Sequence, residues 1–484
     1  MSSEINKGPV VGMRHVQALL IFLHITIVFI GRLNVGVSLV AMTNAETTIP
    51  DFPLREYDWT EAQKSYVISS FFWGYISKQF MGGYLCKRYG AKRVMFWSVF
   101  GSRVCSTLTP LFIGFGEWKA YCAIRVIMGL AQGVIFPCIH QHLARWSLPA
   151  ERSRLGALSY SGCECGNMSA MFLSGMIAKS SLGWHGISYV SAGVAFFWCA
   201  LWFILAADNP TKSRFVGERE FLYIESSLEH TEMYHETTIP IPWRAICTSA
   251  PFLGFLVTRC CGMWGLSTLQ AQIPAQMNGV LDMDMKSTAF FSALPFLAMW
   301  VMSYVYLIAV DILLAGNCLS LTTLRKTFNS IAFWIPCATL IGIGFLGLDQ
   351  KSLAIALMTI SVGVNSDATI GSSLNPIDLS PNHAGILTGI VNTTVSVVTI
   401  VTPLVVGLVV EDGTNRSEWQ IIFIIAAVLL FLGNCVYLCF GTAVTQPWDS
   451  EDYLKLKDSE LATKPAINGA TNGTHKDTME TQTS

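Results

Sequence analysis

Apolar residues occur in twelve long runs, and one polar segment near the middle of the chain separates the first six runs from the last six. Each run has about 20 residues or more, enough for a helix to cross the ~30 Å hydrocarbon core of a bilayer. Lipid offers backbone groups no hydrogen-bond partners, so we expect these runs to be helical. The predicted spans are 16–42, 62–85, 94–115, 118–146, 155–180, 184–207, 251–277, 287–309, 328–348, 352–377, 382–410 and 419–441.

The pattern predicts an all-α membrane protein with twelve transmembrane helices in two six-helix halves. Within the polar centre, residues 216–229 alternate acidic, basic and apolar side chains. That alternation predicts a short amphipathic helix on the membrane surface. The predicted divisions are a cytoplasmic N-terminus at 1–15, an N-terminal half at 16–207, a central loop at 208–250, a C-terminal half at 251–441 and a disordered cytoplasmic tail at 442–484.

The composition agrees with this class of protein and argues against others. Of the 484 residues, 52% are hydrophobic and 13% are charged, and the mean hydropathy is +0.47, which excludes a soluble globular domain. The net charge of −1 implies no nucleic-acid partner. The fourteen cysteines fall mostly inside the runs, where free cysteine behaves as a small hydrophobic residue, so no metal site is predicted. We expect a monomer in the lipid bilayer without a cofactor.

Lysine and arginine gather on one side of the predicted membrane, which marks that side as cytoplasmic and places both termini there. The plasma membrane is the expected location, although Tyr453 to Leu456 resembles a tyrosine-based sorting signal that would suit an endosomal or lysosomal membrane. On the outward side, Asn415-Arg416-Ser417 is a glycosylation sequon. The cations assigned to the cytoplasmic side are Lys7, Arg14, Lys87, Arg88, Lys92, Arg93, Arg145, Arg152, Arg154, Arg325 and Lys326.

The two halves repeat one feature. After the second span, Gly82–Arg93 is a glycine pair followed by a basic turn, and after the eighth, Val310–Lys326 again ends in paired cations. Two six-helix halves related by an axis along the membrane normal are the construction of alternating-access transporters.

Among the charged residues inside the apolar runs, five are candidates for function, because charge is costly in lipid and usually functional there. An arginine cannot neutralise itself, so each buried one needs an anion or a carbonyl as its partner. That partner is either a charged substrate or a residue of a neighbouring helix. The five are Arg32, Arg125, Glu164, Arg259 and Asp367.

Several longer motifs run through the spans and the turns between them. Together they resemble the major facilitator superfamily, specifically its anion:cation symporter family of sodium–phosphate cotransporters, sialin and vesicular glutamate transporters. The resemblance covers nearly the whole chain and is strongest to insect members called inorganic phosphate cotransporters. The motifs are Gly31–Met42, Ser70–Ile76, Arg125–Pro137, Leu148–Leu155, Asn375–Gly385 and Gln446–Trp448.

The resemblance implies roles for two of the buried arginines. Residues matching Arg32 and Arg125 are associated in this family with the negative charge of the substrate, although either could simply tie helices together. Asn34, Tyr75 and Phe136 match positions that line the pocket, and core packing is the competing interpretation for each.

The chain departs from the glutamate transporters at three positions. Their proton-coupling glutamate of the fourth helix is Gln132 here, their second-helix histidine is Ile68, and their seventh-helix arginine is Gly262. Glutamine does not titrate, so Gln132 cannot carry a coupling proton. These differences argue against vesicular glutamate transport.

Glu164 offers a carboxylate on the fifth helix, where sialin-type sequences have glutamine. Gln132 lies ~20 Å and Glu164 ~14 Å from the cytoplasmic ends of their helices, counted at 1.5 Å per residue. Our hypothesis is that the ion-coupling carboxylate has moved from helix four to helix five. The alternative is that Glu164 is a structural partner of Arg125 or Arg103.

Two further charge arrangements are predicted. Arg259 and Asp367 would form a structural or gating salt bridge, with direct substrate contact as the alternative. A latch between helices is expected on the cytoplasmic face, where Lys87 replaces the usual acid of the first basic turn and Asp311 keeps its counterpart in the second. The latch residues are Arg88, Lys92, Arg93, Glu151, Arg152 and Arg154.

These features predict sodium- or proton-coupled symport of a small anion, for which inorganic phosphate is the leading candidate. An organic anion of the sialic acid, glutamate or urate type, carried across a lysosomal or vesicular membrane, is the alternative. A sensor on the same scaffold that has lost transport is a further one. Enzyme activity is not expected, since the spans hold no nucleophile–base arrangement.

Overall fold

A computed structural model describes most of the two predicted halves. Asp367 and Tyr453 lie outside the described residues, as do the side chains of Lys87, Arg152, Arg154 and Asp311. The described residues are 9, 11–43, 57–79, 81–148, 151–232, 241–279, 283, 285–315, 319–346, 350–366, 372, 375–380, 383–412 and 414–450.

The described residues are helical almost throughout, and the helices follow the predicted spans. Eight helical stretches are long and apolar enough to cross a membrane on their own. The N-terminal half comprises α1 (Met13–Thr43), α2 (Glu61–Gln79), α3 (Met81–Tyr89), α4 (Ala91–Gln132), α5 (Ile135–Trp146), α6 (Arg152–Tyr160), α7 (Gly162–Ala178) and α8 (Gly183–Leu205). The C-terminal half comprises α11 (Ala250–Gly279), α12 (Met285–Ala315), α13 (Leu321–Phe345), α14 (Lys351–Val364), α16 (Asn375–Leu379), α17 (Ala384–Val409) and α18 (Arg416–Phe440).

Several predicted spans are interrupted, and local chemistry explains the clearest cases. The long α4 contains two passes, because Glu117 takes a left-handed φ of 49° and reverses the chain between them. The fourth span then breaks at Gly133 and Val134, before α5. Pro137 lies four residues after Gly133, and a proline ring clashes with the carbonyl at that spacing. The second and fifth spans are likewise divided, into α2 and α3 and into α6 and α7.

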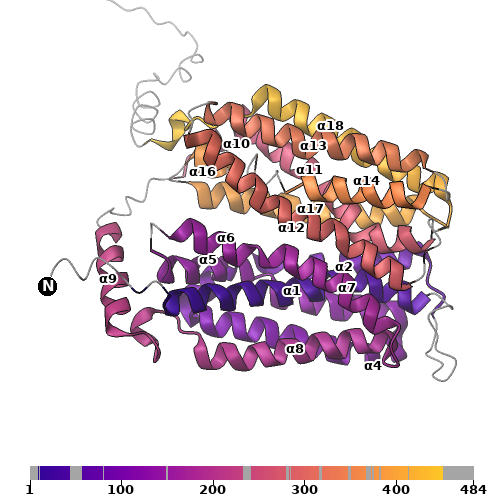
Figure 1. Ribbon diagram of the computed structural model, residues 1–484, viewed down its shortest axis with the longest axis horizontal. Helices are drawn as coiled ribbons and strands as arrows, with labels where there is room; N and C mark the ends of the chain where they lie inside the picture. Colours follow the sequence, from indigo (N-terminus) through magenta and orange to yellow (C-terminus); the bar gives the residue numbers. More distant parts are fainter. Residues whose placement is uncertain are drawn as a thin grey trace, which may run out of the picture.

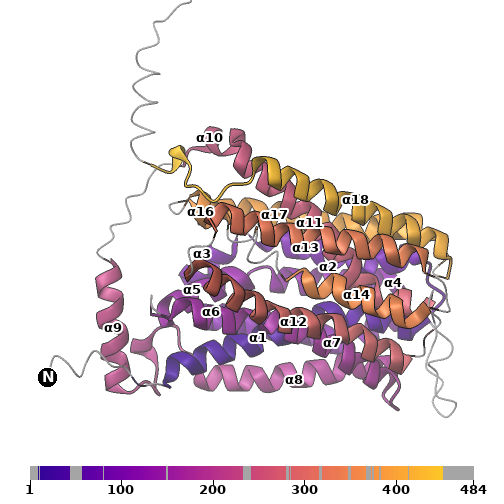
Figure 2. The ribbon, with the colours of Figure 1, turned by 45° about the horizontal axis from the view of Figure 1, so that its top comes forward.

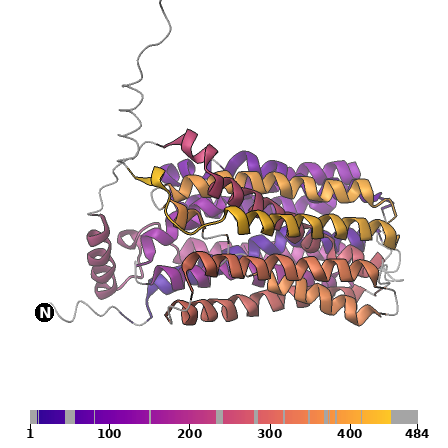
Figure 3. The same cartoon turned by 90° about the horizontal axis from the view of Figure 1, so that it is seen from above.

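The long helices run roughly along one axis, with the two halves side by side (Figures 1, 2 and 3). The central segment contains α9 (Glu218–Glu232) and α10 (Trp243–Thr248). The predicted amphipathic helix is therefore present as α9, and it lies across one end of the bundle (Figure 1). We call this end, where α1 begins and α18 finishes, the α9 end. The opposite end is where α2 and α18 begin.

The hydrophobic core joins the two halves at the opposite end and divides at the α9 end. The largest cluster of buried side chains combines Met42, Tyr57 and Trp184 of the N-terminal half with Ile273 and Phe296 of the C-terminal half. Toward the α9 end, a second cluster lies wholly within the N-terminal half and a third wholly within the C-terminal half. Among the described residues, the buried apolar cluster shared by both halves lies toward the opposite end.

At the α9 end, the central helix α9 is bound to the N-terminal half. Glu220 of α9 accepts hydrogen bonds from the backbone N–H groups of Met13 at 2.8 Å and Arg14 at 3.0 Å, which caps the start of α1. The Arg14 guanidinium also bonds Glu151, with Nε 2.7 Å from Oε2. The Glu220 carboxylate therefore provides acceptors for two of the free backbone amides at the start of α1. Its negative charge also suits the positive end of the helix dipole.

At the same end of the C-terminal half, two sequence motifs pack against each other. Trp448 of the Gln446–Trp448 motif is buried and stacks on His383, and Asp449 accepts a hydrogen bond from Ser380. Gln446 N–H donates to the carbonyl of Leu379 at 2.8 Å. Residues 442–450, which we expected to belong to a disordered tail, are therefore part of the packed half.

Helices α2 and α4 approach each other so closely that glycine is required at their crossing. A Cβ added to Gly129 would overlap the backbone oxygen of Phe71, whereas a Cβ on Gly101 of the same helix would meet no atom within 4 Å. Gly129→Ala should therefore lower the free energy of unfolding by about 1–3 kcal/mol, the usual cost of overpacking.

Gly101→Ala is the matched control and should not lower stability, because alanine is the better helix former. Thermal unfolding of the purified protein in detergent compares the two variants. Equal melting temperatures for them would contradict the close crossing.

Candidate functional site

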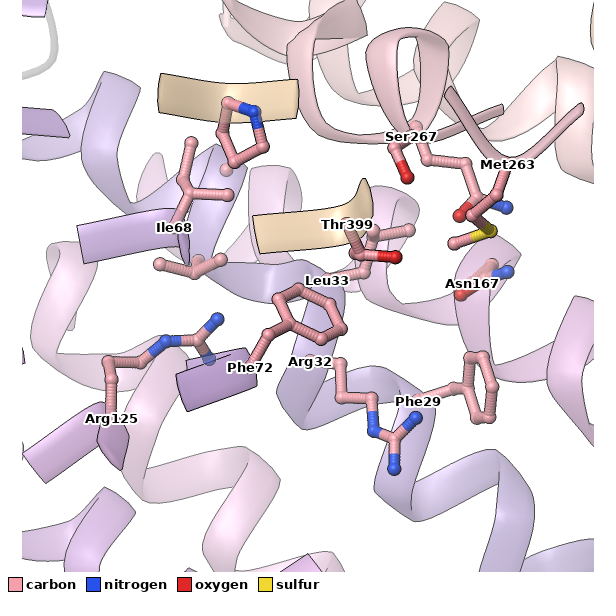
Figure 4. A pocket seen from close by; sticks show the side chains of 14 residues that line it. Phe29, Arg32, Leu33, Ile68, Phe72, Arg125, Asn167, Met263, Ser267 and Thr399 are labelled. Atoms are coloured by element: carbon pink, nitrogen blue, oxygen red, sulfur yellow. The ribbon is translucent and has the colours of Figure 1, made fainter. Parts of the chain in front are cut away.

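A cavity lies between the two halves near the middle of the bundle (Figure 4). Its lining residues border about 840 Å³ of space not filled by atoms, part of which is open to solvent. Four helices of the N-terminal half, α1, α2, α4 and α7, and two of the C-terminal half, α11 and α17, contribute to its wall. The lining residues are Phe29, Arg32, Leu33, Val35, Gly36, Ile68, Phe72, Arg125, Asn167, Met263, Ser267, Gln270, Thr399 and Pro403.

The charge of this cavity is positive. Arg32 and Arg125 line it, and no acidic residue stands among the described residues of its wall. The remaining polar side chains of the wall are neutral and belong to other helices than Arg32: Asn167, Ser267, Gln270 and Thr399 (Figure 4). Most of the wall is apolar. A low-dielectric wall strengthens the attraction between each guanidinium and an anion.

Aromatic rings surround the guanidinium of Arg32. Its Cζ lies 4.7 Å from the ring centre of Tyr75, 5.0 Å from Phe29, 5.3 Å from Phe71 and 5.7 Å from Phe136. Cation–π attraction supplies part of the stabilisation that water would otherwise give. Nε donates to Oε1 of Gln132 at 3.1 Å, and Nη2 has no hydrogen-bond partner in the described structure.

Arg125 is only 3% exposed and shares one of these rings. Its Cζ lies 5.0 Å from the ring centre of Phe71. Nη1 donates to the carbonyl of Gly31 at 3.4 Å, and Nε lacks a partner among the described residues. Both cavity arginines thus keep unused N–H groups.

A third arginine, Arg103 of α4, lies fully buried beside them. Its Nη2 donates to the carbonyl of Ile27 at 2.9 Å, while Nε and Nη1 have no partner in the described part of the chain. A side chain on Gly31 would overlap this guanidinium, so the glycine makes room for it. Sequence reasoning considered Arg103 only as a partner for Glu164. Its position in the third apolar run was the signal that it belongs to the same cluster.

Glu164 lies in the first turn of α7 and is half-buried. The structure does not bring it into an ion pair with Arg125 or Arg103 among the described residues, so the structural alternative for Glu164 is not supported. It lies three residues before Asn167, which lines the cavity. Residues three apart on a helix share a face.

The other predicted pocket residues take different positions. Tyr75 and Phe136 do not line the cavity, but their rings contact the Arg32 guanidinium. Asn34 is buried and is not part of the cavity wall. Ile68 lines the cavity, whereas Gly262 packs against Phe333. The lining residues Asn167, Ser267, Gln270 and Thr399 were missed. Their signal in the sequence was a polar side chain within an apolar run.

The predicted gating charges are only partly brought together. Arg259 is half-buried on α11 and does not line the cavity, and its predicted partner Asp367 lies outside the described residues. In the predicted cytoplasmic latch, Glu151 has Arg14 as its described partner, while Arg88 and Arg93 are exposed and bond no described carboxylate.

An unpredicted ion pair occurs in the other half. Arg325 Nε lies 3.0 Å from Asp378 Oδ2, which joins the second basic turn to the Asn375–Gly385 motif. The sequence held both groups within motifs already recognised, but not their proximity. At the opposite end, Asn415 is exposed as the N-cap of α18 and its Oδ1 accepts from Ser417 N–H at 3.1 Å.

The described helices form two halves with a positively charged cavity between them, an architecture typical of major facilitator transporters. The sequence matches the Major Facilitator Superfamily over residues 33–377. The chain belongs to this family, which confirms the resemblance and the predicted fold.

Similar sequences indicate which members of the superfamily this chain resembles. The chain is 33% identical over 487 residues to a "Putative inorganic phosphate cotransporter" of Drosophila melanogaster, covering 95% of this chain and 91% of the relative. It is 31% identical over 459 residues to sialin of Homo sapiens, covering 91% of each. A solved D-xylose–proton symporter superposes with a TM-score of 0.64 at 13% identity, over 86% of this chain and 96% of the symporter, which is a likeness of fold.

The hydrogen bond from Arg32 to Gln132 makes a testable contribution to stability. Gln132→Leu leaves Nε of Arg32 without an acceptor and should lower the free energy of unfolding by about 1–3 kcal/mol. Gln270→Leu is the matched control, because Gln270 lines the cavity and makes no hydrogen bond in the described structure. Thermal unfolding in detergent measures both. Equal losses in the two variants would show that the hydrogen bond contributes nothing.

Proposed function

We propose that this protein is a secondary active transporter that carries inorganic phosphate together with sodium ions or protons. The observation that supports this most is a cavity between the halves lined by two guanidinium groups and no described carboxylate. A cavity of this charge suits an anion. The relative named as a phosphate cotransporter supports the choice of phosphate.

The two arginines suit a tetrahedral oxyanion for a chemical reason. A guanidinium presents N–H groups in a planar fork that matches two oxygens of a phosphate. Arg32 Nη2 and Arg125 Nε are buried without a described hydrogen-bond partner, so each has an N–H group to offer if its side chain turns toward a bound anion. The rings around Arg32 restrict its guanidinium without neutralising it, which lowers the entropy cost of binding.

The direction of access follows from the ends of the bundle. The predicted cytoplasmic cations Arg14, Arg93, Arg145 and Arg325 all belong to the α9 end, so we assign that end to the cytoplasm. The separate cores there favour an inward-facing state, with the joined core closing the outward side. Rocking of one half against the other would expose the cavity alternately.

Glu164 is our candidate for ion coupling. It is a half-buried carboxylate without an arginine partner among the described residues, one turn from Asn167 of the cavity wall. A carboxylate in that setting can bind a proton or a sodium ion as the substrate site fills.

An organic anion is the second candidate, and the cavity wall favours it. Phe29, Leu33, Phe72 and Met263 offer apolar surface that a phosphate ion cannot use. An anion with a hydrocarbon body would bury that surface while the arginines bind its carboxylate. The relationship to sialin agrees with this candidate. We assign the protein to the plasma membrane for phosphate and to an endosomal or lysosomal membrane for an organic anion.

Uptake into liposomes distinguishes these candidates. Phosphate, sialic acid, glutamate and urate are supplied in turn, with an imposed sodium gradient, proton gradient or neither. We expect gradient-driven phosphate uptake. Uptake of an organic anion alone would replace the first candidate by the second, and no uptake of any would favour a sensor that has lost transport.

Arg32→Ala and Arg125→Ala should each reduce uptake at subsaturating substrate by about 30-fold or more. Removing one partner of a buried charge pair costs about 2–5 kcal/mol. Arg244→Ala, an exposed arginine on α10, is the control and should leave uptake unchanged. Wild-type kinetics in either cavity variant would refute the anion site.

Glu164→Gln should abolish gradient-driven uptake but spare exchange of labelled for unlabelled substrate. Exchange needs the binding site and the rocking motion but no net movement of the coupling ion. Glu411→Gln, which alters an exposed carboxylate at the opposite end, is the control. Retained dependence on the gradient would exclude Glu164 from coupling.

A further inference from the structure

Two grooves lie next to each other on the N-terminal half at the α9 end, away from the central cavity. The first, of about 910 Å³, lies between α2, α3 and the two passes of α4 and includes Lys78 and Tyr89. The second, of about 960 Å³, lies between α4, the end of α8 and the chain that follows, and includes Lys212. Arg93 and Trp97 line both grooves. They are four residues apart, so they stand one above the other on one face of α4.

The charge of the grooves is largely unmatched. The charged groups of the Lys78, Arg93 and Lys212 side chains have no hydrogen-bond or ion-pair partner in the described part of the chain. Lys92 Nζ donates to the carbonyl of Phe203 at 2.8 Å. Asp208 is the one described acid of the two walls, and its Oδ1 accepts the backbone N–H of Lys92 at 2.8 Å. Four cations therefore face a single carboxylate.

Exposed aromatic side chains border the same cations. Trp97 is 64% exposed and Phe203 is 67% exposed, and Tyr89 at the end of α3 is also exposed. Tryptophan and tyrosine concentrate where hydrocarbon meets headgroups. Trp97 lies one helical turn farther from the α9 end than Arg93. The charged contact is therefore nearer the end of the bundle and the apolar contact is deeper.

We propose that an anionic phospholipid binds here, astride the first turns of α4. Its headgroup is held by Arg93, Lys78, Lys92 and Lys212 together, and one acyl chain lies in each groove beside Trp97. Basic pockets between helices at the cytoplasmic surface bind anionic headgroups in this manner. A free phosphate ion would use the cations but leave both apolar grooves and their aromatic borders unfilled. The two grooves on either side of one arginine favour a ligand with two chains.

The experiment uses the delipidated full chain in detergent and phosphatidylserine as the probe. Native mass spectrometry counts bound lipids, with phosphatidylcholine of identical chains for comparison. We expect phosphatidylserine to bind more tightly, by about fivefold for each cation that contacts it. Glycerophosphoserine and inorganic phosphate should not compete at matched concentrations. Equal binding of the two lipids, or full competition by either soluble anion, would overturn the proposal.

Variants locate the site. Arg93→Gln combined with Lys78→Gln should remove the preference for phosphatidylserine, whereas Arg244→Gln, at the same end of the other half, should retain it. If the double variant fails to yield monodisperse protein, Lys212→Gln, which alters an exposed side chain, should reduce the preference by about fivefold. An unchanged preference for phosphatidylserine in the double variant would refute this site. Where Lys212→Gln replaces the double variant, an unchanged preference in Lys212→Gln would refute it. The lipid count does not depend on transport, so failure of the proposed function leaves it interpretable.

Discussion

The burial of guanidinium charge beside α1 is the constraint on which the rest of the site depends. Arg32, Arg103 and Arg125 cannot give up their protons, and no described carboxylate neutralises them. The positive charge is stabilised instead by aromatic rings, by the backbone carbonyls of Ile27 and Gly31, and by the side-chain amide of Gln132. These partners are neutral, so the cluster keeps a positive field. The anion that we propose as the substrate would complete the charge balance that the fold leaves open.

The division of the core determines how such a charged centre can be reached. A joined core at one end excludes water from that side, and separate cores at the other allow each half to stay intact if the two part. Each half also has its own polar fastening at the α9 end, around Glu220 in one and around Asp378 and Asp449 in the other. Each half is therefore packed and hydrogen-bonded within itself at the α9 end, as a rigid-body movement of one half against the other requires.

The spans and the family could be predicted because they depend on local properties: the length of apolar runs and motifs of consecutive residues. The break before α5 was also readable from Pro137. Contacts across the bundle could not be read in this way. Glu220 meets residues 206 and 207 positions away, and nothing near it in the sequence indicates that. Tyr75 and Phe136 were recognised as site residues, but only the packing of α2 and α5 places their rings on Arg32.

The cap that Glu220 forms on α1 attaches the central segment to the N-terminal half. Because both of its oxygens are engaged by backbone amides of α1, α9 travels with the N-terminal half as a fixed part of it. In the structure α9 is thus part of the N-terminal half, although in the sequence it belongs to the segment between the halves. Release of α9 would leave the backbone amides of Met13 and Arg14 without their acceptor. A change in the central segment would therefore also destabilise the first turn of α1.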